Sequence, residues 1–118
     1  MNVRRGDVVL AKYPFSSGTG ATRRPAVVVQ DDRDNVRRQS TIIAQITTNL
    51  RRVAEPTHLL IKAETSEGRQ AGVLHDSVIS CNDLATVRED RIDRVIGHLS
   101  ESLMRQVDAA LKAALGLE

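Results

Sequence analysis

The chain has 118 residues, which is enough for one domain but too few for two, and its single cysteine excludes an internal disulfide. No stretch approaches the roughly 20 apolar residues of a membrane span, and the first 23 residues contain no apolar run of signal-peptide length, so we expect one soluble, cytoplasmic domain over residues 1–118. The net charge is only +2, but residues 1–60 carry ten Lys and Arg against five acidic residues, whereas residues 61–118 carry seven against ten.

Short apolar runs rich in Val, Ile and Thr dominate residues 7–99, and they are too brief to be helices. They predict strands at Asp7–Lys12, Pro25–Gln30, Thr41–Thr47, Thr57–Lys62, Gly72–Leu74, Ser77–Cys81, Ala85–Arg88 and Arg94–His98. The segments between them have turn chemistry, most clearly at Ser16–Gly20, Asp31–Arg38 and Glu67-Gly68. Residues 13–24 form the one loop long enough to move as a flap. Many short strands predict a barrel or a sandwich.

The spacing of apolar residues changes in the last segment. Leu103, Val107 and Leu111 recur there at a spacing of four, which places them on one face of a helix. Ser100 is placed to cap the start of this helix, and Gly116 suits the position just after its end. We therefore predict one amphipathic C-terminal helix, packed on the barrel, on a second subunit or on both.

Arginine doublets account for most of the basic charge in the first half of the chain. Arginine, with its planar and forked guanidinium, favours two-point contact with phosphate, so a polyanionic partner is suggested. Four solvated loop ends would give the same pattern. The doublets are Arg4-Arg5, Arg23-Arg24, Arg37-Arg38 and Arg51-Arg52.

Familiar catalytic signatures are absent: there is no Gly-x-Ser-x-Gly elbow, Walker loop, dinucleotide fingerprint or His-Glu-x-x-His motif. Cys81 has no metal-binding partner at a typical spacing and is expected to be a small buried apolar residue. His58, His75 and His98 stand alone in sequence, which is more typical of structural histidines. With one Phe and one Tyr, the chain also lacks the aromatic platforms of common single-strand RNA binders.

Two polar residues remain at the ends of predicted strands. Arg24 directly precedes Pro25, whose ring favours an extended backbone at the residue before it. Thr47 closes the apolar run that begins at Ile42. If these two strands are neighbours in the sheet, Arg24 and Thr47 could flank one groove, although strand ends commonly carry such residues.

Five ordered blocks resemble the MazF/PemK family of toxins over nearly the whole chain. They are Arg5–Val9, Arg24–Val29, Ala44–Thr48, Asp76–Ile79 and the C-terminal helix. The resemblance implies a mainly β fold, an SH3-like small barrel with a C-terminal α-helix, which pairs as a homodimer. It also implies an endoribonuclease that cuts single-stranded RNA to 2′,3′-cyclic phosphate and 5′-hydroxyl ends, without a metal or cofactor. Its cognate antitoxin would place an acidic, disordered tail in the basic groove.

In such a reaction the ribose 2′-OH attacks the adjacent phosphorus, so the protein must align the substrate and stabilise the charge on the phosphorane. By the resemblance, Arg24 and Thr47 are the catalytic residues: Arg24 meets the charge and Thr47 donates a hydrogen bond to a nonbridging oxygen. The RNA-binding residues are expected in the loops around residues 13–24, 48–54 and 76–83. They are Ser16, Ser17, Thr48, Asn49, Arg51, Ser77 and Asn82.

The chain departs from the family at the proton-transfer positions. In some relatives an arginine and an aspartate flank a position like Cys81, whereas Ser80 and Asn82 stand there in this chain. This leaves the general base unassigned, with Asp76, Asp83 or a histidine as candidates.

Two other functions are alternatives to the nuclease. The alternative is a non-catalytic toxin of the same fold that inhibits a protein target such as DNA gyrase, but the retained Arg24 and Thr47 favour the nuclease. A regulatory DNA binder is disfavoured because no helix-turn-helix pattern precedes the barrel. The recognised RNA sequence and the class of RNA that is cut do not follow from the amino-acid sequence.

Overall fold

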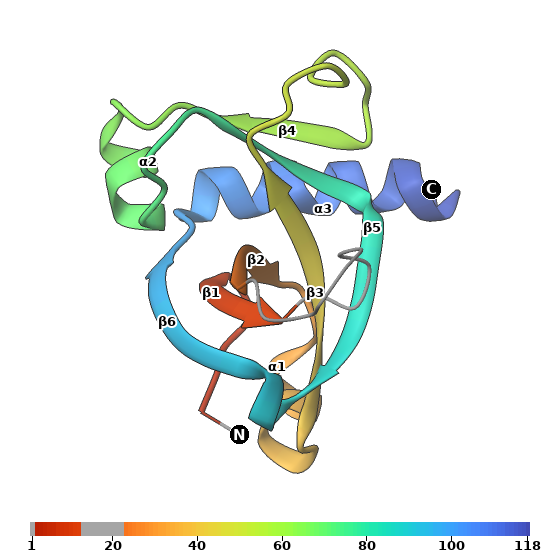
Figure 1. Cartoon of the computed structure of the whole chain (residues 1–118). Coiled ribbons are helices and arrows are strands. Elements are labelled where there is room, and N and C mark those ends of the chain that lie inside the picture. The colour runs from red at the N-terminus through yellow and green to blue at the C-terminus, as the bar shows by residue number, and fades with distance from the viewer. Residues whose placement is uncertain (1, 13–22) are drawn as a thin grey trace.

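The computed structural model describes residues 2–12 and 23–118, so most of the predicted flap lies outside the described residues. Six strands form one antiparallel sheet in the order β4-β5-β3-β2-β1-β6 (Figure 1). The elements are β1 (Asp7–Lys12), β2 (Arg23–Val28), α1 (Asp32–Arg37), β3 (Ser40–Thr47), β4 (His58–Ile61), α2 (Ser66–Ala71), β5 (Ser77–Arg88), η1 (Glu89–Arg91), β6 (Ile92–His98) and α3 (Glu101–Leu115).

The sheet curls into a small barrel that the described strands do not close. β5 and β6 curve around β1 and β2, and η1 joins them (Figure 1). β4 and β6 are the two edges of the strand order. The prediction of a mainly β fold with a C-terminal helix is confirmed. Among the described residues, no helix is long and apolar enough to span a membrane.

Two short helices replace predicted turns and a predicted strand. The polar run after β2 forms α1, because the Asp31 side chain caps it by accepting from the N–H of Arg33 at 2.8 Å. Glu67 and Gly68 lie inside α2. The strand predicted at Gly72–Leu74 is wrong, since Gly72 ends α2 in the left-handed conformation, with φ of 78°.

The strands predicted at Ser77–Cys81 and Ala85–Arg88 are two halves of one 12-residue strand, β5. Each half pairs with a different part of β3, and the register shifts between the Ala44 and Gln45 pairs. The sequence predicted two strands because polar residues interrupt the apolar run at Asn82 and Asp83. The interruption is a bulge within one strand.

The core has two parts, one on each face of the sheet. The part under α3 contains Leu103 and Val107 of the helix, which are 5% and 0% exposed. The part on the opposite face contains Val9, Val28 and Ile43. This division follows from the alternation of side chains along each strand.

The C-terminal helix begins and ends where the sequence predicts. The Ser100 hydroxyl accepts from the N–H of Leu103 at 3.1 Å, and Gly116 ends the helix in the left-handed conformation, with φ of 69°. Because Leu103 and Val107 are buried within the single chain, the apolar stripe of α3 serves the core of its own subunit.

Substitution of Gly97 by alanine is expected to destabilise the fold. A Cβ at this position of β6 would overlap the backbone of Gln70 and Ala71 at the end of α2, and backbone atoms cannot move aside as a flexible side chain can. We expect a loss of about 2–3 kcal/mol in the free energy of unfolding, measured by urea denaturation. In the control Gly116→Ala, a Cβ meets nothing within 4 Å, so only the left-handed backbone is penalised, by about 1 kcal/mol. Equal losses would contradict the packing argument.

Candidate functional site

The face of the sheet that points away from α3 carries the polar residues of interest. Arg24 of β2, Gln45 and Thr47 of β3, Ser80 of β5 and His58 of β4 all lie on this face, because their neighbours in the same strands pack into the core under α3. Those neighbours are Val27, Ala44, Ile46, Ile79, Cys81, Leu59 and Ile61. The pairing of the strands thus brings side chains from four strands onto one surface.

The strand register brings Arg24 and Thr47 to the same end of one ladder. In the pairing of β2 with β3, Ala26 is opposite Gln45. Arg24 lies two residues before Ala26, and Thr47 lies two residues after Gln45, so continuing the antiparallel register places them across from each other. Arg24 is exposed and Thr47 is half-buried. The two strands are therefore neighbours, which is the condition that the sequence-based expectation required. The roles of Arg24 and Thr47 stay a prediction.

A bulge in β5 carries further polar groups onto this surface. Gln45 pairs with Ser80, but its neighbour Ala44 pairs with Leu84, so residues 81–83 have no partners in β3. The Cys81 N–H donates to the carbonyl of Thr57 at 3.0 Å. The hydroxyl of Ser80, which is only 2% exposed, donates to Oδ2 of Asp83 at 2.8 Å. The bulge therefore places the Asp83 carboxylate beside Ser80.

A polar hollow of about 250 Å³ lies beside Thr47. The Thr47 Oγ1 accepts from the N–H of Asn49 at 3.1 Å, which leaves its own O–H available as a donor. His58 of β4 is directly opposite Ser80 in the pairing of β4 with β5. The hollow is lined by Gln45, Thr47, Asn49, Arg52, His58, Ser80 and Asp83.

The expected RNA-binding residues differ in their exposure and in their position relative to the hollow. Ser16 and Ser17 lie outside the described residues. Thr48, Asn49 and Arg51 are exposed after β3, and Asn82 is exposed on the bulge, but only Asn49 among these lines the hollow. Ser77 is 4% exposed, and its hydroxyl donates to the carbonyl of His75 at 2.7 Å. Ser77 is therefore less suited to an RNA contact than the other expected residues.

The candidates for the general base lie in different parts of the structure. Asp76 accepts from the N–H of Ala63 at 2.9 Å, at the loop before α2. The Nε2 of His98 lies 2.9 Å from the side-chain nitrogen of Gln70. Asp83 and His58 line the hollow beside Thr47, and the Nδ1 of His58 lies 2.8 Å from the Thr57 hydroxyl oxygen.

The sequence did not assign Gln45 or Arg52 to the site, and it left His58 only as one of three histidines that could be the general base. Gln45 carries a usable signal, since it lies two residues before Thr47 and must share its face of the strand. Arg52 and His58 carry no such signal. They meet Thr47 only through the turn before β4 and the pairing of β4 with β5.

Cys81 is the buried residue that the sequence predicts, with 1% of its surface exposed. Burial raises the pKa of its thiol to about 11, so the thiol is protonated near neutral pH and is a poor nucleophile. Within residues 2–12 and 23–118, no three His, Cys, Asp or Glu side chains are grouped so that they could hold a metal ion.

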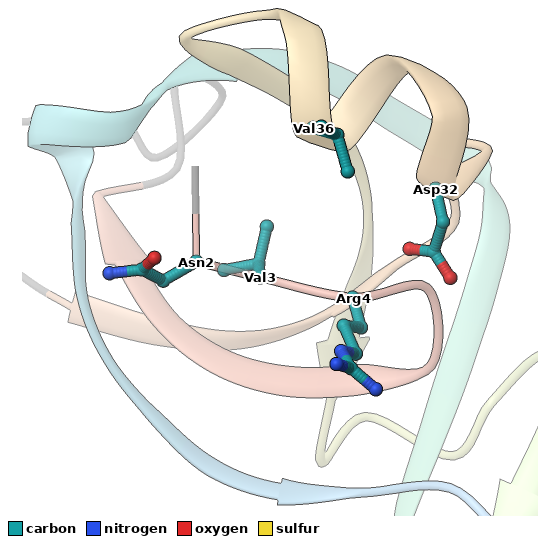
Figure 2. A pocket seen from close by; sticks show the side chains of 5 residues that line it. All are labelled: Asn2, Val3, Arg4, Asp32 and Val36. Carbon is teal, nitrogen blue, oxygen red and sulfur yellow. The ribbon is translucent and has the colours of Figure 1, made fainter.

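A second hollow, of about 400 Å³, lies between the N-terminal segment and α1. Figure 2 shows the side chains of Val3 and Val36 pointing toward each other across it. Asp32 accepts from the N–H of Arg5 at 2.7 Å and from the Asn35 amide at 3.0 Å, so its carboxylate joins α1 to the N-terminal segment. None of the expected site residues lines this hollow, which is formed by Asn2, Val3, Arg4, Asp32 and Val36.

Comparison with known families gives one match over almost the whole chain. Residues 4–115 match the family described as PemK-like, MazF-like toxin of type II toxin-antitoxin system.

Individual relatives agree with this match. Endoribonuclease EndoA of Bacillus subtilis (strain 168) is 34% identical over 118 residues, covering 99% of this chain and 97% of the relative. Endoribonuclease MazF of Staphylococcus epidermidis is 35% identical over 116 residues, covering 98% and 92%. Among solved structures, an endoribonuclease in complex with its cognate antitoxin from a mycobacterial species has a TM-score of 0.77 at 20% identity, covering 97% of this chain and 95% of that one.

Proposed function

The chain belongs to the PemK-like, MazF-like family of type II toxins, and from this premise we propose that it is a metal-independent endoribonuclease acting on single-stranded RNA. Two relatives covered over more than nine-tenths of their length are named endoribonucleases. The observation that supports the proposal most is the position of Arg24 and Thr47 at the same end of the β2–β3 ladder, where Thr47 lines a polar hollow.

The chemistry proposed for this site uses a nucleophile that the substrate supplies. The ribose 2′-oxygen forms a bond to the adjacent phosphorus, and the bond from phosphorus to the 5′-oxygen of the next nucleotide breaks. The 2′-OH loses its proton and the leaving 5′-oxygen gains one, which gives a 2′,3′-cyclic phosphate and a 5′-hydroxyl. The protein contributes alignment and charge stabilisation, which are the two largest sources of rate for such a step.

Arg24 and Thr47 have complementary roles in this proposal. Arg24 is exposed, so it can meet a phosphate without first breaking a buried contact. Its guanidinium is charged at any physiological pH and can donate two parallel hydrogen bonds to phosphorane oxygens. Thr47 is held by the N–H of Asn49 and can direct its own O–H toward a nonbridging oxygen.

Incubation of the purified protein with a long RNA in EDTA tests the proposed function. Cleavage into fragments with 5′-hydroxyl ends is expected, since no step requires a divalent metal. Intact RNA, together with inhibition of a protein target such as DNA gyrase, would instead support the non-catalytic alternative. Sequencing of the fragment 5′ ends would then identify the recognised sequence and the class of RNA.

An antitoxin with an acidic, disordered tail is the protein partner that we propose. Carboxylates of such a tail would compete with RNA phosphates for two arginines: Arg52, which lines the polar hollow, and Arg24, which is exposed near the start of β2. We also propose that residues 1–118 act as a single toxin domain, and that the protein acts in the cytoplasm, where its RNA substrate is present.

A homodimer is the expected state in solution. α3 buries its apolar stripe within its own subunit, so the partner must use other surfaces, and several large apolar side chains are available. Val36, Leu74 and Val95 are 77%, 86% and 47% exposed. Sedimentation at micromolar concentration should give about twice the 13.0 kDa mass of the chain. A 13 kDa particle at that concentration would contradict the dimer.

A further inference from the structure

The imidazole of His58 lines the hollow beside Thr47 and is held in position on one side of its ring. The backbone N–H of His58 donates to the carbonyl of Glu55 at 3.0 Å, and the ring Nδ1 lies 2.8 Å from the Thr57 hydroxyl oxygen. A hydroxyl can both donate and accept, so Thr57 can partner Nδ1 whether or not that nitrogen carries a proton. Among the described residues, no side chain hydrogen-bonds to the other ring nitrogen, Nε2. The ring is therefore oriented through Nδ1, and Nε2 can exchange a proton with a ligand in the hollow.

The register of the sheet sets the distance between His58 and Thr47. His58 is opposite Ser80, and Ser80 is opposite Gln45, which lies two residues before Thr47 on the same face of β3. Two strand spacings across the sheet and two residues along a strand place the Cα atoms of Thr47 and His58 roughly 12 Å apart. Because both side chains line the hollow, the space between them suits one phosphate and its ribose.

The other candidates for the general base fit this position less well. The described lining of the hollow includes neither Asp76, His75 nor His98. Asp83 is part of the lining, but a carboxylate is a much weaker base than an imidazole near neutral pH. A general base works best when its pKa is close to the working pH. Position and chemistry together therefore favour His58.

We infer that His58 is the general base of the cleavage reaction. The inference rests on the proposed ribonuclease function and assigns the proton transfer that the sequence leaves open. Nε2 accepts the proton of the 2′-OH as the 2′-oxygen forms its bond to phosphorus, and Nδ1–H of the resulting imidazolium donates to the Thr57 hydroxyl. The 5′-oxygen leaves with the electron pair of the broken bond and takes a proton from water. The hydroxide that remains takes the proton from the imidazolium, which restores the neutral ring.

Replacement of His58 by alanine should lower the single-turnover cleavage rate by about a hundredfold or more, the effect typical of losing a general base. Binding of a 2′-O-methyl strand should change little. Added imidazole should restore the rate of His58→Ala by about tenfold or more, because it can enter the space left by the ring and accept the same proton. The matched control is His75→Ala, since His75 is an exposed histidine outside the lining. It should keep the wild-type rate with and without imidazole, and thermal melting should show all three proteins folded.

A strand with sulfur in place of the leaving 5′-oxygen separates a base from an acid, because sulfur leaves without being protonated. His58→Ala should lose the same factor in rate on the sulfur strand as on the all-oxygen strand. A wild-type rate in His58→Ala, a loss that imidazole does not restore, or a loss that disappears with the sulfur strand would overturn the inference while the ribonuclease function stands. A wild-type protein that cuts no RNA would overturn the proposed function and this inference with it.

Discussion

An oligonucleotide whose sugar 5′ of the scissile phosphate carries 2′-O-methyl or 2′-deoxy should resist cutting completely, because the substrate has lost its own nucleophile. Within residues 2–12 and 23–118, the structure offers no evident substitute for the 2′-OH. Cys81 is buried, and burial raises the pKa of its thiol to about 11. The Ser80 hydroxyl, 2% exposed, donates to Asp83. The measurement is the first-order rate of cleavage at a known site, with blocked and all-ribose strands compared under identical conditions.

Binding should survive the block, because phosphate contacts do not read the sugar. The blocked strand should therefore inhibit cleavage of the all-ribose strand, with an inhibition constant close to the dissociation constant of the substrate. The all-ribose strand should be cut in EDTA and end in a cyclic phosphate. Cleavage of the blocked strand, or a strict need for added magnesium, would refute the attack by the 2′-OH and the roles proposed for Arg24 and Thr47.

Replacement of Arg24 by alanine should lower the cleavage rate by about two to three orders of magnitude, the effect typical of losing one preorganised donor to a developing charge. Binding of the blocked oligonucleotide should weaken much less, because the charge that Arg24 meets is largest on the phosphorane. Single-turnover rates and the dissociation constant of the blocked strand separate the two effects. Equal losses in rate and binding would reduce Arg24 to a phosphate contact.

The adjacent arginine provides the control for this substitution. Arg23 precedes Arg24 in β2, so its side chain belongs to the other face of the strand, and its guanidinium lies 3.6 Å from Asp93 of β6. Arg23→Ala removes the same charge one residue away and should change the rate by less than about tenfold. If Arg23→Ala and Arg24→Ala lose rate equally, the general positive charge of the strand end matters and not the placement of one guanidinium.

Much of the fold could be predicted from local patterns. Alternating apolar residues predict β1 and β3 within a residue of their observed bounds, because one face of each strand must be buried. Ser100 and Gly116 fix both ends of α3 through capping and a left-handed backbone. The helices α1 and α2 were missed, since six residues are too few to show a helical period.

Part of the candidate site could also be predicted from single segments of the sequence, whereas the rest depends on segments that are far apart in sequence. Arg24 and Thr47 could be singled out from the amino-acid sequence, because each stands at one end of a predicted strand in a block that resembles the family. The hollow could not, since it depends on which strands pair and in what register. Pairing β5 with both β3 and β4 aligns Gln45, Ser80 and His58 in one row, and the shift after Ala44 expels residues 81–83 into a bulge. Only then does the Asp83 carboxylate lie beside Ser80, because a bulge reverses the alternation that sequence alone would assign to the rest of the strand.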